Sequence, residues 1–208
     1  MSAAADCEAI GGGLLGQPVN SVTTLAFVAA GIWIASRSAS RSASHRASQR
    51  PDRRWVAAAL IATGFGSFLF HGPMPPGAEW AHDVTLAWLI LLVGGTGTRW
   101  ERWTHVPGLA VLGALFAVFP AVADPVAVAL TVVAVSVRIR LDRSPHTWGA
   151  FSLLAAAAIF GRLGATGWPL CDPESLIQPH GVWHLVAAAS VVWWATASTT
   201  SEATQVSS

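Results

Sequence analysis

Two histidines four residues apart open the last apolar stretch of the sequence, in the run PHGVWH (179–184). On a helix, His180 and His184 would share one face, one turn apart. With this spacing, one helix can supply two of the three protein ligands of a catalytic zinc ion, whose fourth position is left for water. An isolated pair of this kind can equally be two interfacial histidines hydrated by lipid headgroups. A metal site therefore requires further ligands nearby.

A second polar group lies in the run GSFLFHGPMPPGAEWAHDV (66–84). Ser67 and His71 again have the i,i+4 spacing, at the end of one apolar stretch, and Asp83 lies at the start of the next. Together with the histidine pair, these residues could hold a metal ion beside a carboxylate and a hydroxyl. This requires that the fold bring three separate segments to one depth.

The composition is that of an integral membrane protein. Of 208 residues, 53% are hydrophobic and 11% charged, with a mean hydropathy of +0.51, which is outside the usual range of soluble domains. The net charge of +1 gives no reason to expect a nucleic acid as partner. Unpaired backbone groups are costly in lipid, so we expect the spans to be helices of roughly 17 to 25 residues. The apolar stretches are 18–36, 55–71, 80–97, 106–123, 125–141, 146–165 and 179–197.

We therefore predict one all-α membrane domain over residues 1–208, a bundle of seven transmembrane helices. The low-complexity basic segment 37–54 is too polar to pack a core, and we predict that it is a flexible cytoplasmic loop. Residues 198–208 are predicted to be a flexible tail.

The arginines orient this bundle. Eleven of the twelve arginines lie in or near every second connection, at 37–54, 99–102 and 138–143. The positive-inside rule then places the N-terminus outside and the C-terminus in the cytoplasm. With this topology, the polar residues described above all lie in one leaflet, and ionisable groups within membrane helices mark functional sites. We predict a metal site that brings together Ser67, His71, Asp83, His180 and His184.

These motifs resemble the signature of the alkaline ceramidase family: S-x3-H closing the second span, an Asp opening the third and H-x3-H opening the seventh. The family belongs to a superfamily of seven-helix membrane proteins that also includes the adiponectin and progestin receptors. The resemblance, closest to bacterial members, extends to Cys7-Glu8, to QPVNSVTTLAFVAAG (17–31) and to CDPESL (171–176), and so covers nearly the whole chain. It implies a zinc ion held by His71, His180 and His184, with Ser67 and Asp83 beside the water that the zinc binds.

The residue types fit the hydrolysis of an amide. Zinc lowers the pKa of bound water to about 7 and polarises an acyl carbonyl. Asp83 could accept the proton of the water and return it to the leaving nitrogen, and Ser67 could donate a hydrogen bond to the developing oxyanion. A role for Ser67 as a covalent nucleophile is less favoured. It would need a histidine base that binds no metal, and none remains except His82. On a helix, His82 points about 100° away from Asp83, and we interpret it as an interfacial residue or as a neighbour of the ligands.

The expected depth of the site points to a lipid. At about 1.5 Å of rise per residue, the first turns of the third and seventh spans lie at the level of a lipid's amide or ester linkage. We predict a zinc hydrolase of a bacterial cytoplasmic membrane, with its site toward the extracytoplasmic face. It would cleave a ceramide-like N-acyl lipid at its linear amide bond, giving a fatty acid and a sphingoid base. The oligomeric state is left open.

Three alternatives remain. The substrate could be another lipid amide or ester. The protein could instead be a seven-helix receptor or scaffold with a structural zinc. A transporter is less favoured, since the helices lack obvious paired breaks or repeat halves.

Two features depend on the resemblance. Eukaryotic family members have a calcium site near the N-terminus, built from an Asp-Trp-Cys-Glu-x-Asn run and a later Glu. Here the run reads ADCEAI and Gln17 stands at the later position, so only Glu8, with Asp6, remains for calcium, whose binding is doubtful. The shared extracytoplasmic side and the resemblance favour a Cys7–Cys171 disulfide in an oxidising compartment. Two cysteines alone could equally stay reduced.

Overall fold

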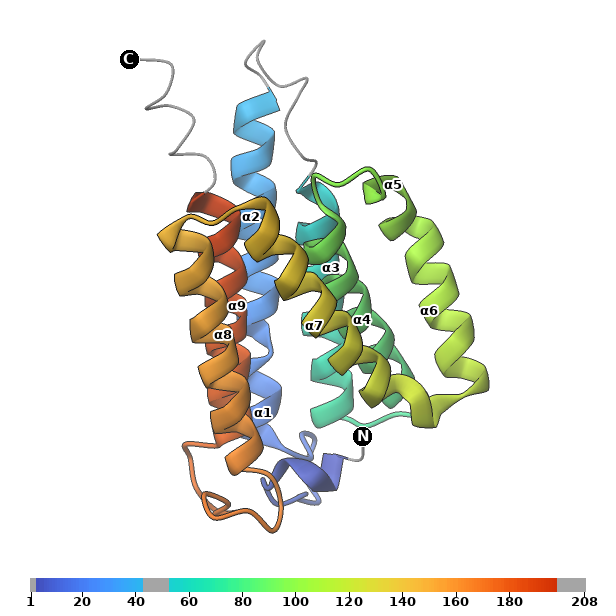
Figure 1. Ribbon diagram of the computed structural model, residues 1–208. Coiled ribbons are helices and arrows are strands. Elements are labelled where there is room, and N and C mark those ends of the chain that lie inside the picture. Colours follow the sequence, from blue (N-terminus) through green and yellow to red (C-terminus); the bar gives the residue numbers. More distant parts are fainter. Residues whose placement is uncertain (1–2, 43–52, 198–208) are drawn as a thin grey trace.

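The computed structural model of the protein describes residues 3–42 and 53–197, and their regular secondary structure is entirely helical (Figure 1). All seven predicted stretches are helical, the first being divided into two consecutive helices. The elements are η1 (Ala3–Asp6), α1 (Pro18–Thr23), α2 (Leu25–Ser42), α3 (Arg54–His71), α4 (Ala78–Gly95), α5 (Glu101–Thr104), α6 (Val106–Val118), η3 (Pro120–Val122), α7 (Ala123–Leu141), α8 (Pro145–Leu163) and α9 (Pro179–Ala197).

Two predicted boundaries are wrong. The fourth stretch ends at Val118 rather than at 123, because Pro120 has no N–H to continue the helix and restricts Phe119 before it. The predicted loop at 37–54 begins later, because α2 continues to Ser42. Arginine and alanine are good helix formers and serine is tolerated, so a polar sequence can extend a helix beyond its apolar part. The rest of that loop, 43–52, and the tail at 198–208 lie outside the described residues.

The helices form a bundle in which α2, α3, α4 and α9 surround the apolar core (Figure 1). The helix pairs α2–α3, α3–α4, α8–α9 and α4–α7 pack closely, and α6 lies at the outer edge against α4. Small residues permit this packing: a Cβ on Gly31 would lie 2.6 Å from the carbonyl oxygen of Ala57, so α2 and α3 can touch only because Gly31 has no side chain.

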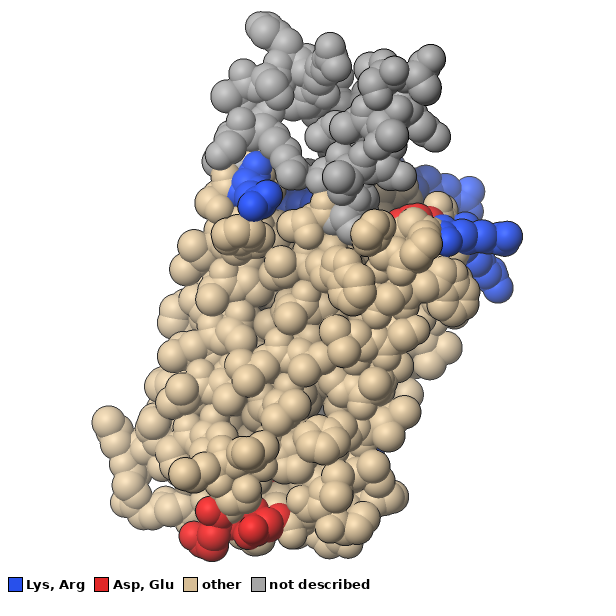
Figure 2. All heavy atoms as spheres, turned by 90° about the vertical axis from the view of Figure 1, so that its left-hand side faces the viewer, with Lys and Arg blue, Asp and Glu red and all other residues tan. Residues whose placement is uncertain are grey.

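Charged side chains lie at the two ends of the bundle. Figure 2 shows arginines at one end, with an acidic side chain among them, acidic residues at the other end, and an uncharged belt between. Two helical segments of the described chain, Pro18–Ser38 and Pro120–Leu141, are long and apolar enough to cross a membrane. Only 11% of the second is buried within the protein. At 13 residues, α6 is shorter than the roughly 20 that a span usually needs.

Candidate metal centre

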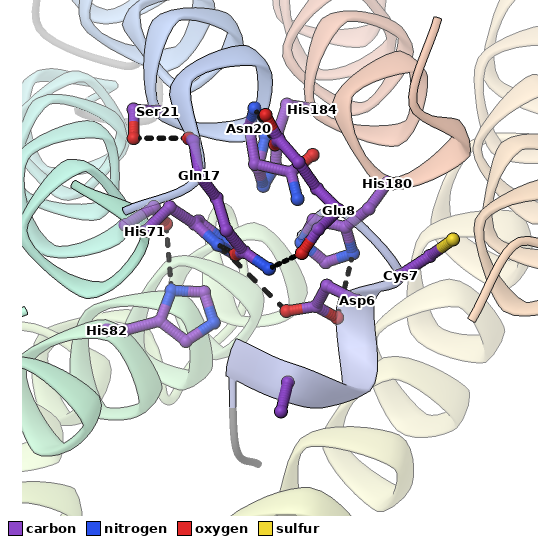
Figure 3. A network of polar contacts seen from close by, with 12 residues as sticks. Asp6, Cys7, Glu8, Gln17, Asn20, Ser21, His71, His82, His180 and His184 are labelled. Carbon is purple, nitrogen blue, oxygen red and sulfur yellow. Dashed lines mark hydrogen bonds and ion pairs between the residues drawn. The ribbon is translucent and has the colours of Figure 1, made fainter. Parts of the chain in front are cut away.

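Three histidines from two helices meet at one end of the bundle. His71 is the last residue of α3, and His180 and His184 lie in the first two turns of α9 (Figure 3). One ring nitrogen from each lies within 4.8 Å of the others. The structure therefore brings together the three predicted ligands, although His71 is more than 100 residues away in sequence from His180 and His184.

The unpaired nitrogens of this triad fit a metal ion. The Nε2 atoms of His71, His180 and His184 are all buried and have no hydrogen-bond partner. A buried polar atom without a partner costs free energy, and three such atoms at one point would be unfavourable in a site meant to hold nothing. A metal bound by the three lone pairs removes this penalty. The geometry leaves the identity of the metal open.

The other nitrogen of each ring, Nδ1, contacts an oxygen. Glutamine and aspartate oxygens accept hydrogen bonds, and the Thr23 hydroxyl already lies 2.9 Å from two carbonyls to which it can donate, so each Nδ1 is the natural site of the ring proton. This tautomer leaves the Nε2 lone pair free for a metal. The three pairs are His71 with Gln17 Oε1 (2.7 Å), His180 with Asp6 Oδ1 (3.3 Å) and His184 with Thr23 Oγ1 (3.1 Å).

Gln17 is held firmly in this role. Its side-chain Nε2 donates to the carbonyl of Glu8 (2.8 Å), and its backbone N–H donates to the carbonyl of His71 (2.8 Å). The carboxamide is wholly buried, so its oxygen can accept only from groups of the protein itself. The chain before α1 is thereby tied to the end of α3.

A disulfide joins Cys7 in the N-terminal segment to Cys171 in the loop between α8 and α9, the pair considered from the sequence. Thr166 strengthens this attachment: its hydroxyl accepts from the N–H of Cys7 (3.1 Å), and its N–H donates to the carbonyl of Ala5 (2.9 Å). Asp6 is thus held at the triad. Burial raises the pKa of the Asp6 carboxyl above its ordinary value, and the neighbouring His180 opposes this rise. A cation at the triad would favour the carboxylate form.

Asp6 and Glu8, the two residues considered for calcium, face different partners. Both carboxylate oxygens of Glu8 accept backbone N–H groups at the start of α1, from Val19 (2.7 Å) and Asn20 (2.8 Å). Such groups have no partner within their own helix, so Glu8 caps α1. Asp6 instead faces His180, at 3.3 Å from its Nδ1.

Ser67 and Asp83 are linked through His82, which lies near both side chains. The hydroxyl of Ser67 lies 2.8 Å from His82 Nδ1, and Asp83 Oδ1 lies 4.0 Å from His82 Nε2. The His82 ring is 6.1 Å from the ring of His71, centroid to centroid, which places this second group beside the triad. His82 is only 5% exposed, so of the two interpretations the structure favours a neighbour of the ligands.

Sequence reasoning did not identify Gln17 and Thr23 as partners of the ligands. A signal was present for Gln17, because Gln17, Asn20, Ser21 and Thr24 recur at i, i+3, i+4 and i+7 in an apolar stretch, but Thr23 lies outside this stripe. All four are fully buried. A polar stripe on a membrane helix indicates that this face meets other polar groups inside the bundle.

Comparisons of the chain with protein-family models, with curated proteins and with solved structures found no match.

Replacing Thr23 with valine is expected to weaken metal binding about 10-fold or more, because His184 loses the oxygen that orients its ring. The change preserves shape and removes only the hydroxyl. Thr131→Val is the matched control, since that hydroxyl bonds to Ala127 on α7, in another part of the chain. Chelator competition with the purified variants measures the effect. Equal metal affinity in the two variants would show that the Thr23 contact is incidental.

Proposed function

We propose that the protein is a membrane-embedded zinc hydrolase that cleaves the amide bond of a ceramide-like N-acyl lipid. The observation that carries this proposal is the convergence of three buried, unpaired Nε2 atoms beside a serine, a histidine and an aspartate. The resemblance of the motifs to alkaline ceramidases supplies the substrate class.

A bilayer setting is supported by the surface. The uncharged belt in Figure 2 and the strongly exposed Val111, Val128 and Ile159 form an apolar surface of the kind that lipid covers. We propose that seven helices cross the membrane, with the arginine-rich end in the cytoplasm and the triad in the extracytoplasmic leaflet. The Cys7–Cys171 disulfide agrees with this side, because disulfides persist in oxidising compartments.

His71, His180 and His184 would hold the metal. Imidazole nitrogens suit zinc, and three protein ligands with a fourth position left open are typical of catalytic zinc sites. When bound, zinc supplies a Lewis acid for the acyl carbonyl and acidifies water.

The remaining residues act on the reacting groups. Asp83 is largely buried and would take a proton from the attacking water and deliver it to the leaving nitrogen. Ser67 would contact the reacting groups through its hydroxyl. The surrounding apolar helices exclude water, so each electrostatic interaction and hydrogen bond in the site is stronger than it would be in solution.

The second candidate is a receptor or scaffold in which the metal is structural. The burial of the metal centre favours this second candidate, since His71 and His184 are 0% and 2% exposed. The group of three candidate ligands found among the described residues favours the hydrolase, because structural zinc sites usually have four protein ligands.

Incubation of the purified protein in zinc-loaded form with a panel of N-acyl and ester lipids, followed by mass spectrometry, distinguishes these functions. We expect release of fatty acid and amine from a ceramide-like lipid, and a loss of at least about 100-fold in turnover for Asp83→Ala with zinc retained. Asp124→Ala, which removes an exposed carboxylate near the start of α7, is the control. Absence of product from every lipid would leave the receptor, and cleavage of esters alone would exclude an amidase.

A further inference from the structure

We propose that His82 is a positioning residue that sets the direction of the Ser67 hydroxyl, so that Ser67 presents lone pairs, rather than its proton, to the metal centre. This role rests on the hydrolase proposed above. Under it, Ser67 binds an O–H or N–H of the reacting groups, the reverse of the oxyanion donor expected from its position in the sequence.

The register between α3 and α4 brings the two side chains together. The hydroxyl of Thr63 donates to the carbonyl of Thr85 (3.0 Å), one turn away from the Ser67–His82 contact. Between these contacts lies Gly66, where an added Cβ would be 3.0 Å from the carbonyl oxygen of Ala81. The helices approach this closely because position 66 has no side chain, and Ser67 can then reach His82 directly.

Both partners are shielded from water. Ser67 is 1% exposed, and the imidazole of His82 stacks on Phe70 with ring centroids 4.9 Å apart and planes 11° from parallel. The stacking restricts rotation of the ring. Buried polar groups need partners, and the 2.8 Å contact is the one that the Ser67 hydroxyl makes with the described residues.

Asp83 favours the tautomer of His82 that sets the direction of the Ser67 hydroxyl hydrogen. Its Oδ1 lies 4.0 Å from His82 Nε2, which is beyond hydrogen-bond distance, but the negative charge of a carboxylate so close attracts an N–H and so favours the proton on that nitrogen. A neutral imidazole protonated at Nε2 has a lone pair at Nδ1. Nδ1 therefore accepts from the Ser67 hydroxyl, whose hydrogen is engaged and whose lone pairs remain available on the side away from His82.

A double-mutant cycle tests whether His82 acts through Ser67. In the zinc-loaded protein, His82→Phe keeps an aromatic ring against Phe70 but removes the acceptor, and we expect kcat to fall roughly 10- to 100-fold at unchanged zinc content. His82→Asn, whose amide oxygen can replace Nδ1, should restore part of this loss. When Ser67 is already alanine, His82→Phe should cause no further loss. A full additional loss in that background would overturn the proposal.

A spectroscopic measurement tests the same contact without any lipid. In zinc-loaded protein with ¹⁵N-labelled histidine, we expect His82 to be protonated at Nε2, and its Nδ1 resonance to shift in Ser67→Ala. A proton on Nδ1, or a resonance that does not respond to Ser67→Ala, would overturn the proposal even if the protein is an active hydrolase. If no lipid is cleaved while the shift is observed, the contact is upheld and the hydrolase proposal fails.

Discussion

Replacing any one of His71, His180 and His184 with alanine is expected to reduce bound zinc from about one ion per chain to a small fraction, and to abolish lipid hydrolysis. Each variant leaves two of three ligands. The two remaining histidines would then hold the ion through two ring nitrogens instead of three, which is fewer protein ligands than zinc sites use. Elemental analysis after dialysis against a weak chelator measures the zinc content.

His105→Ala is the matched control for this experiment. His105 stacks on Trp55 with centroids 4.8 Å apart, at the start of α6, and takes no part in the triad. It should keep a full complement of zinc. Full occupancy in all three triad variants would show that the nitrogens do not bind the metal.

Replacing both Cys7 and Cys171 with serine is expected to lower stability by about 2 to 5 kcal/mol and to weaken zinc binding as well. The disulfide links residues 164 positions apart in sequence. It anchors the N-terminal segment, whose Asp6 contacts His180. Without it, Asp6 and the loop before α9 are no longer tied together covalently. Thermal unfolding in detergent and chelator competition measure the two effects.

Asp6→Asn separates the contribution of the disulfide from that of the Asp6 carboxylate, because it keeps the disulfide and replaces the carboxylate with an amide. We expect weaker zinc binding in Asp6→Asn with most of the stability retained. Two reactive thiols per chain, in unreduced protein recovered from its native membrane, would contradict the disulfide itself. Unchanged zinc affinity in both variants would show that the N-terminal segment does not support the metal centre.

The sequence alone predicted the number of long helices and the three histidines of the centre. Hydropathy is a property of consecutive residues, so it locates helices without knowledge of their neighbours. The i,i+4 spacing of His180 and His184 specifies a shared face once the segment is helical. The alternation of arginine-rich connections then placed His71 at the same end of the bundle, because each helix reverses the direction of the chain.

The tertiary structure alone decided which oxygens orient these ligands and what Ser67 touches. Thr23 and His184 are 161 residues apart, and Gln17 and His71 are 54 apart, so their contacts depend on the rotation and depth of packed helices. Hydropathy does not specify either quantity. The Ser67–His82 contact depends in the same way on the register of α3 against α4, which the close approach at Gly66 permits. Residue types and spacing define a local geometry, whereas hydrogen bonds between distant segments follow from how side chains of different shape fill one interior.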